Sequence, residues 1–91
     1  MTLKPFHLTV ITPDQVFFEG QVGSMVVPGG TGSFGILANH APLLSTLDPG
    51  RLVLTKTDGG KQYLRIGAGF IDILNNDVTL LTESIETEKS S

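Results

Sequence analysis

A glycine cluster sets the strictest limit on how this chain folds. Residues 28–35 hold four glycines within eight positions: Gly29, Gly30, Gly32 and Gly35. A helix does not tolerate such a cluster, because each glycine costs roughly 0.5–1 kcal/mol relative to alanine in a regular element. The segment continues to Leu44 through Asn39 and Pro42, which favour a compact turn. Long connections in small domains are commonly functional, so we expect 28–44 to be the working surface.

The rest of the chain alternates apolar and polar residues with a period of two. The pattern is clear in 6–11 and 70–74, and turn signals such as Asp58-Gly59-Gly60 recur roughly every 8–12 residues. No window has the period of a helix. We therefore predict an all-β fold over residues 1–82, a small antiparallel β-sandwich or barrel of about ten short strands. The polar segment 83–91 is expected to be a frayed tail or the start of a linker.

Two glycine-containing sites are expected to distort the sheet. Glu19-Gly20 predicts a bend or bulge within a strand. Gly67-Ala68-Gly69 has minimal side chains, so it predicts a sharp bend or the close approach of another backbone.

Composition excludes several classes of protein. The chain has 91 residues, a size that predicts one domain with one core, and it contains no cysteine, which excludes disulfides and zinc fingers. Six Lys and Arg against nine Asp and Glu give a net charge of −3, which argues against a nucleic-acid partner. The N-terminus lacks a signal or transit pattern, and no window approaches the roughly 18 apolar residues of a membrane span. We expect a soluble protein.

Motifs that suggest chemistry are weak. Residues 30–35 match G-x-G-x-x-G, but no helix can follow them, so we interpret the match as a glycine-shaped β turn. His7 and His40 are the only histidines, too few for a zinc site without carboxylates from elsewhere. His40 has Ser33, Ser45 and Asp48 nearby in sequence, but no nucleophile motif surrounds either serine. Two interpretations of His40 stay open, a turn residue bonded to nearby backbone and a partner contact.

Three longer motifs together resemble the N-terminal β-sandwich domain of the epsilon subunit of F-type ATP synthases. They are FHLTVITPDQVFFEG at 6–20, GSFGILANHAPLL at 32–44 followed by LDPG at 47–50, and YLRIGAGFIDILNNDVTLL at 63–81. They follow the family order over nearly the whole domain, and the HAPLL turn together with the downstream PG and GxGF segments is highly specific.

The resemblance implies a central-stalk rotor subunit of a proton- or sodium-translocating ATP synthase. Such a subunit couples the gamma subunit to the c-ring and has no catalytic residues, no cofactor and no metal. It implies a peripheral position on the cytoplasmic face of a bacterial inner membrane, with a plastid thylakoid as the alternative. Carried onto this sequence, the family's partner-facing loops fall on Thr31, Gly32, Ser33, Phe34, Gly35, Asn39, His40, Ala41, Pro42 and Leu43.

Details of this surface follow from the residue types. We expect Phe34, Ile36 and Leu43 to be exposed and to supply apolar contact area. Family members often carry an acidic residue where Ser33 stands, so a salt bridge to the ring is not expected here.

The chain ends at Ser91, before the C-terminal helical hairpin of many members. This favours a natural short form without the hairpin's inhibitory function or its nucleotide site.

Two other functions remain as alternatives. A free-standing β-sandwich module that binds a peptide or carbohydrate in the same loop would be monomeric and respond to a small ligand. A small hydrolase using His40 would turn over a generic ester and lose this activity in His40→Ala.

Overall fold

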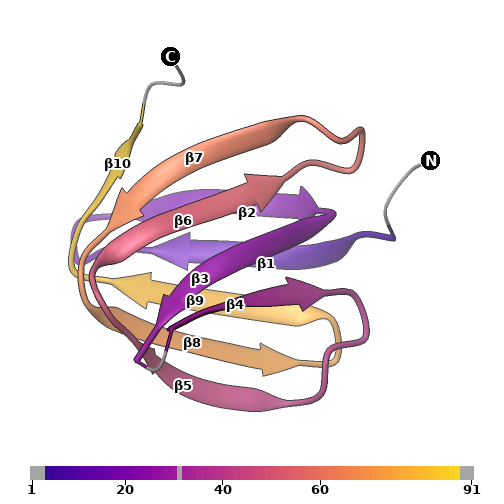
Figure 1. The fold of residues 1–91 in the computed structure, drawn as a ribbon, viewed down its shortest axis with the longest axis horizontal. Coiled ribbons are helices and arrows are strands. Elements are labelled where there is room, and N and C mark those ends of the chain that lie inside the picture. The colour runs from indigo at the N-terminus through magenta and orange to yellow at the C-terminus, as the bar shows by residue number, and fades with distance from the viewer. Residues whose placement is uncertain (1–3, 31, 89–91) are drawn as a thin grey trace.

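The computed structural model describes residues 4–30 and 32–88, and these residues form ten strands and no helix (Figure 1). The all-β prediction is confirmed, and the described residues offer no helix with the length and apolarity to cross a membrane. The strands are β1 (Phe6–Ile11), β2 (Val16–Val22), β3 (Ser24–Gly29), β4 (Gly32–Leu37), β5 (Leu43–Leu47), β6 (Gly50–Thr55), β7 (Lys61–Ile66), β8 (Gly69–Leu74), β9 (Asp77–Thr82) and β10 (Ile85–Thr87).

Hydrogen bonds join the strands into one curled sheet with the order β10-β7-β6-β3-β5-β8-β9-β1-β2, and β4 pairs with β3. The sheet folds over between β3 and β5, which share the residue pair Gly29 and Leu47. Strands β3, β4, β6 and β7 lie in front of β8, β9, β1 and β2 in Figure 1, and β5 runs along the lower edge. Pairing is antiparallel except between β1 and β9, which run parallel. The expected antiparallel arrangement is wrong for this pair, because the chain leaves β1 and returns beside it only at β9.

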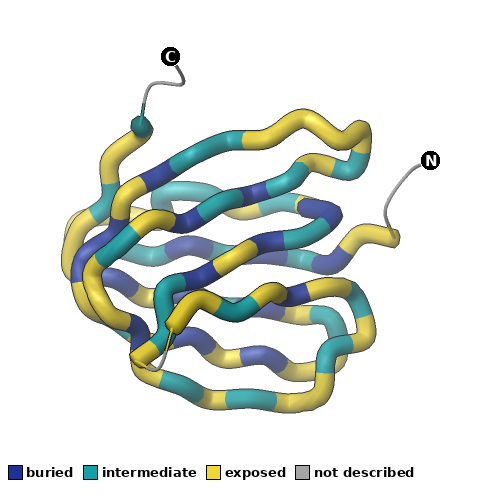
Figure 2. The backbone as a smooth tube through the Cα atoms, in the orientation of Figure 1, coloured by how far each residue is buried: buried dark blue, intermediate teal, exposed yellow. Residues whose placement is uncertain are grey.

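Alternation along each strand builds the core between the two layers. In β1, for example, Phe6, Leu8 and Val10 are buried, whereas His7 and Thr9 are partly exposed. Figure 2 shows the same alternation of buried and exposed positions along most strands. Because successive side chains of a strand point to opposite faces, every second residue remains on the outer surface and is free to contact a partner.

The bulge lies at a different place from the one expected. Glu19 and Gly20 pair regularly with Thr9 and Leu8, and the register shifts instead between Val10 and Ile11, so that Phe17 is the extra residue. The shift has a packing reason, since it lets the consecutive residues Phe17 and Phe18 both pack against the core.

The segment 67–69 brings two backbones together, as the sequence predicts. A Cβ built on Gly69 would lie only 1.9 Å from the Leu81 carbonyl oxygen, so a larger residue does not fit. Next to this contact, the buried Thr82 hydroxyl donates to the Gly67 carbonyl oxygen at 3.0 Å. This hydrogen bond satisfies the hydroxyl inside the protein.

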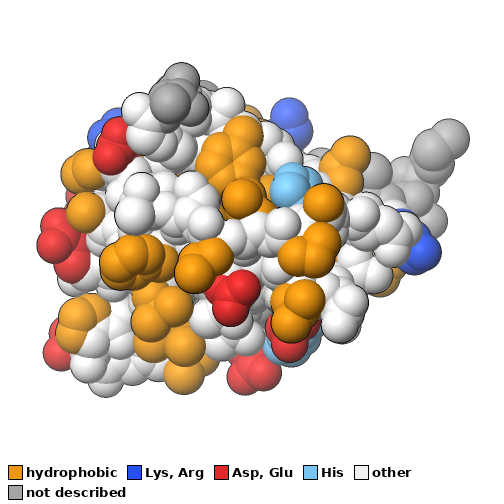
Figure 3. Space-filling model, turned by 90° about the horizontal axis from the view of Figure 1, so that it is seen from below, with side chains coloured by type: hydrophobic (Ala, Val, Ile, Leu, Met, Phe, Trp, Pro, Cys, Tyr) orange, Lys and Arg blue, Asp and Glu red, His pale blue; other side chains and the backbone are white. Residues whose placement is uncertain are grey.

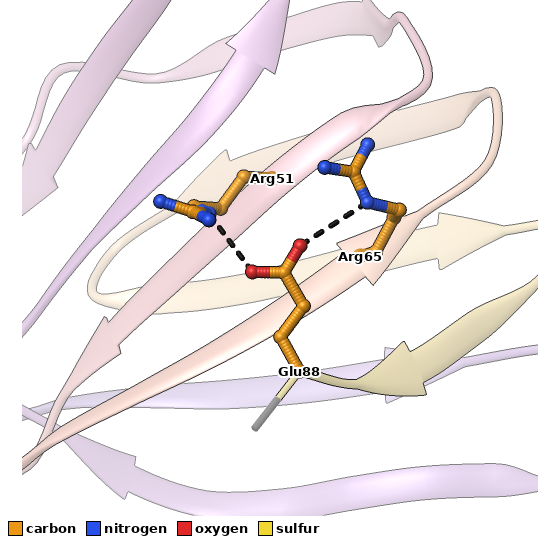
Figure 4. Close-up of polar contacts among 3 residues, drawn as sticks. All are labelled: Arg51, Arg65 and Glu88. Carbon is orange, nitrogen blue, oxygen red and sulfur yellow. Dashed lines mark hydrogen bonds and ion pairs between the residues drawn. The ribbon is translucent and has the colours of Figure 1, made fainter. Parts of the chain in front are cut away.

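The end of the described chain is paired with the sheet. Strand β10 pairs with β7, and the Glu88 carboxylate accepts hydrogen bonds from Arg51 Nε at 2.9 Å and Arg65 Nε at 3.1 Å (Figure 4). Arg51 and Arg65 lie directly opposite each other on β6 and β7. Glu88 thus offsets part of the repulsion between two like charges that lie opposite each other across the strands. The expected frayed tail differs from the structure at residues 85–88, because this long-range contact leaves no local pattern.

Candidate partner-binding surface

The glycine cluster forms the tip of the β3–β4 hairpin. Gly29 pairs with Gly32, whose φ of 129° is a backbone conformation that other residues rarely adopt. The predicted glycine-shaped turn is therefore present, and the G-x-G-x-x-G residues continue from this turn into β4. A pyrophosphate site of the dinucleotide type needs a helix after the glycines, and β4 occupies that place. Thr31, a predicted site residue, lies outside the described residues.

The side chains of β4 point alternately to the core and to the surface. The sequence prediction was partly wrong about which of them point outward. Ile36 pairs with the buried Met25 and is 1% exposed, and Phe34 is half-buried against the core. The expectation that Ile36 is exposed is wrong, because the pairing with β3 turns this side chain inward. The outward positions of β4 are Ser33, Gly35 and Leu37, and Leu37 is 58% exposed.

The 38–42 turn carries the second group of predicted site residues. Asn39 has a φ of 67°, which confirms the predicted left-handed conformation. His40 Nδ1–H donates to the Ala41 carbonyl oxygen at 2.7 Å, and the His40 amide donates to the Leu37 carbonyl oxygen at 3.3 Å. One ring nitrogen of His40 is thus used by local backbone, as one of the two interpretations predicts. Asn39, Ala41 and Pro42 are exposed, and Leu43 is half-buried against the core.

The structure does not bring the two predicted groups into one compact site. Gly32 lies at the hairpin tip beside the end of β5, whereas the 38–42 turn leads into the start of β5. The six residues of β4 separate them by about 20 Å. The predicted residues form a strip along β4 with a group at each end.

The sequence prediction missed a second surface. It lies across β8, β9, β1 and β2, in the layer opposite β4. In register across β8, β9, β1 and β2 lie four apolar residues that we call the apolar row: Phe70, Leu81, Ile11 and Val16. Phe70, Leu81 and Val16 are 54%, 43% and 56% exposed, and Ile11 is partly exposed. The apolar row could have been found in the sequence as apolar residues at strand positions that the alternation assigns to the outer face.

A groove of about 680 Å³ lies at the apolar row. Ile11, Pro13, Thr46, Phe70 and Leu81 are among the residues that line it, so its walls come from four separate segments of the chain. The neighbouring surface is also partly apolar, and hydrophobic side chains gather in several groups on the face seen in Figure 3, with acidic side chains between them. Exposed apolar groups of this kind mark interaction sites in soluble proteins.

The candidate group around His40 and a cluster of metal-ligating residues are both missing from the part of the chain that the structure describes. The His40 ring bonds to the Ala41 backbone, and no hydrogen bond joins it to Ser33, Ser45 or Asp48 within the described ranges. The described part of the chain also has no cluster of three or more His, Asp or Glu that could hold a metal ion.

Comparison with known families decides the assignment. The family described as "ATP synthase, Delta/Epsilon chain, beta-sandwich domain" matches residues 5–88. The chain belongs to this family. The resemblance stated from the three motifs is therefore confirmed, and the epsilon-family domain includes β10, which the sequence placed in the tail.

Named relatives agree with this assignment. The ATP synthase epsilon chain of Dichelobacter nodosus is 39% identical over 79 residues, covering 87% of this chain and 55% of the relative. That of Chlorobaculum tepidum is 38% identical over 82 residues, covering 90% of this chain and 93% of the relative. The epsilon-family domain therefore spans little more than half of one relative and nearly all of the other.

Solved structures confirm the fold. A chain of the Euglena gracilis mitochondrial ATP synthase, OSCP/F1/c-ring, aligns with a TM-score of 0.88 at 22% identity, covering 96% of this chain and 56% of that one. A chain of the Tetrahymena thermophila mitochondrial ATP synthase central stalk/c-ring aligns with a TM-score of 0.76 at 15% identity, covering 94% and 69%.

Proposed function

We propose that this epsilon-family domain is a non-catalytic rotor subunit in the central stalk of an F-type ATP synthase, where it couples the gamma subunit to the c-ring. Its relatives are named ATP synthase epsilon chains, and its structural neighbours come from assemblies that contain a c-ring. The single observation that carries the proposal is the exposed apolar row on an otherwise well-packed domain of this family. The domain has the surface of a subunit within a permanent complex.

The apolar row is the proposed contact with gamma. Phe70 and Leu81 are direct neighbours on β8 and β9, and the groove beside them accepts a protruding side chain. Burying aromatic and aliphatic residues at the centre of an interface supplies most of the binding energy in stable complexes. Leu44, which is 74% exposed on β5, extends the apolar surface toward the 38–42 turn. We therefore assign Asn39, His40, Ala41, Pro42 and Leu43 to the same partner.

The hairpin tip is the proposed contact with the c-ring. Gly32, Ser33 and Gly35 lie on it or just after it, and their small or polar side chains let a polar loop approach the backbone closely. Thr31 and the neighbouring Phe34 complete the predicted group. Since Ser33 is uncharged, we expect hydrogen bonds to the ring and little dependence of this contact on salt.

The fold suits the transmission of torque. A closely packed interior is stiff, so a rotation imposed on one face reaches the other with little deformation. The core side chains lie between the gamma-facing layer and β4, which bears the proposed ring contact. With bacterial relatives, this function corresponds to a peripheral position on the cytoplasmic face of a bacterial inner membrane.

The test is co-expression of the chain with the gamma subunit from the same source, followed by size-exclusion chromatography. We expect a one-to-one complex that persists at high salt, because apolar burial is insensitive to ionic screening. His40→Ala should weaken the complex without changing the circular dichroism spectrum of the chain. Two results together would overturn the proposal. The two proteins would elute separately even in the presence of the c-ring, and the monomer would respond to a peptide or carbohydrate library.

A further inference from the structure

Two asparagines from distant parts of the chain form a reciprocal pair. The backbone amide of Asn39 donates to Asn76 Oδ1, and Asn76 Nδ2 donates to Asn39 Oδ1 at 3.0 Å. Asn39 belongs to the 38–42 turn, and Asn76 belongs to the tight turn between β8 and β9. The pair therefore joins two turns that are 37 residues apart in the sequence.

Asn76 is itself held firmly. Its carbonyl oxygen accepts a hydrogen bond from the His7 amide at 2.9 Å, which ties the β8–β9 turn to β1. Asn75 and Asn76 have φ values of 53° and 62°, as a two-residue hairpin turn between paired strands requires. The Asn76 side chain thus starts from a backbone that both flanking strands and β1 fix in place.

The 38–42 turn has few other anchors. Among the described residues, its remaining hydrogen bonds are local ones, from the His40 amide to Leu37 and from the His40 ring to Ala41. Asn39, Ala41 and Pro42 are exposed, so packing adds little restraint. The two bonds to Asn76 are the long-range hydrogen bonds that connect the described part of this turn to the rest of the fold.

We propose that Asn76 is a positioning residue that presents the 38–42 turn to the gamma subunit in its binding conformation. The inference rests on the proposed function of this turn. A partner's apparent affinity falls in proportion to the fraction of molecules that hold the competent conformation. By fixing the turn before binding, the Asn39–Asn76 pair raises that fraction. Asn76 contacts Asn39, and it acts on the partner through the turn.

The first test measures the turn itself, without any partner. Asn76→Gly removes the side chain and keeps a residue that accepts positive φ. Its matched control is Asn75→Gly, in the same turn and with the same backbone requirement, but with no side-chain hydrogen bond among the described residues. We expect amide exchange of Asn39 to rise roughly five- to tenfold in Asn76→Gly, as for a lost hydrogen bond, and to stay unchanged in Asn75→Gly.

A purely structural role of Asn76 would give a different pattern. In that case both glycine variants would raise exchange across β8 and β9 and lower the unfolding midpoint together. Asn76→Asp retains an acceptor for the Asn39 amide, so we expect it to restore most of the protection of Asn39. Equal exchange of Asn39 in Asn76→Gly and in the unaltered chain would overturn the proposal.

The second test measures binding of gamma by isothermal titration calorimetry. Asn76→Gly should weaken binding roughly three- to tenfold, with Asn75→Gly near the unaltered value and Asn76→Asp between them. If gamma does not bind the unaltered chain, the proposed function fails, while the exchange experiment still decides whether Asn76 holds the turn. If exchange changes as expected but gamma binds all variants equally, the positioning inference is wrong and the proposed rotor function stands.

Discussion

Single residues at close backbone contacts set the tightest limits on this fold. Gly69 lies where β8 begins, directly beside the Leu81 carbonyl group. No rotation of a side chain can relieve a clash with backbone, so the neighbouring strand itself would have to move. Leu81 also belongs to the apolar row, so a shift of its backbone would displace part of that row.

Gly69→Ala should lower the free energy of unfolding by about 3 kcal/mol, since overpacking against backbone is among the more costly core changes. Gly35→Ala is the matched control, because a Cβ at this strand position meets only the Met25 carbonyl oxygen at 3.9 Å. Urea denaturation of both variants makes the comparison. A Gly69→Ala variant as stable as Gly35→Ala would contradict the close approach of β8 and β9.

The phase of β4 is tested by two adjacent residues. Ile36→Ala removes a buried side chain and should destabilise the domain by about 3 kcal/mol. Leu37→Ala truncates an exposed side chain and should change stability by less than about 0.5 kcal/mol. Thermal unfolding of the two variants measures the difference. If Leu37→Ala were the more damaging, β4 would face the other way.

At the scale of elements, the C-terminal strand combines backbone pairing with the ion pairs of one carboxylate. Strand β10 has three residues and lies at the end of the strand order. Glu88 follows β10 and forms ion pairs with both arginines of the chain. The arginine side chains are more than half exposed, whereas the Glu88 side chain is mostly buried. Arg51 also lies over the Tyr63 ring, 5.6 Å from its centre. The two Glu88 ion pairs, together with the backbone hydrogen bond from the Glu88 amide to the Tyr63 carbonyl oxygen at 2.9 Å, connect this short segment to β6 and β7.

Glu88→Gln should release β10 while leaving the rest of the sheet intact. We expect amide exchange in 85–88 to rise several-fold, and global stability to fall by less than about 1 kcal/mol, because partly exposed ion pairs contribute little. Glu86→Gln, within β10 itself, serves as control. Equal exchange in the two variants would show that backbone pairing alone holds β10, as would protection of 85–88 that is unchanged in high salt.

Local signals explain which elements the sequence predicted well. The Asn39 and Asp58-Gly59 turns and the strand at 6–11 follow from the backbone preferences of a few neighbouring residues. The parallel β1–β9 pair, the phase of β4 and the pairing of β10 depend on partners far away in the sequence. The candidate site shows the same limit, because its residue types predicted two turns, whereas the apolar row exists only once four strands lie in register.

At the scale of the whole molecule, the two proposed partners contact different parts of one stiff body. The apolar row lies on the layer formed by β5, β8, β9, β1 and β2, and the hairpin tip belongs to the other layer (Figure 1). The side chains between the layers pack into one continuous core. A domain of this construction can hold gamma and the ring in a fixed relative orientation, which is the proposed function.

The most direct test of this account is the dissociation constant of the gamma complex for the unaltered chain, Phe70→Ser and Val26→Ser, measured by titration calorimetry on folded protein. Both substitutions remove an exposed apolar side chain from a strand, but Val26 lies on β3 in the opposite layer. Phe70→Ser should weaken binding at least roughly tenfold, as expected for a central aromatic contact, and Val26→Ser should change it by less than about twofold. Equal affinities of the two variants, or the larger loss in Val26→Ser, would contradict the assignment of gamma to the apolar row.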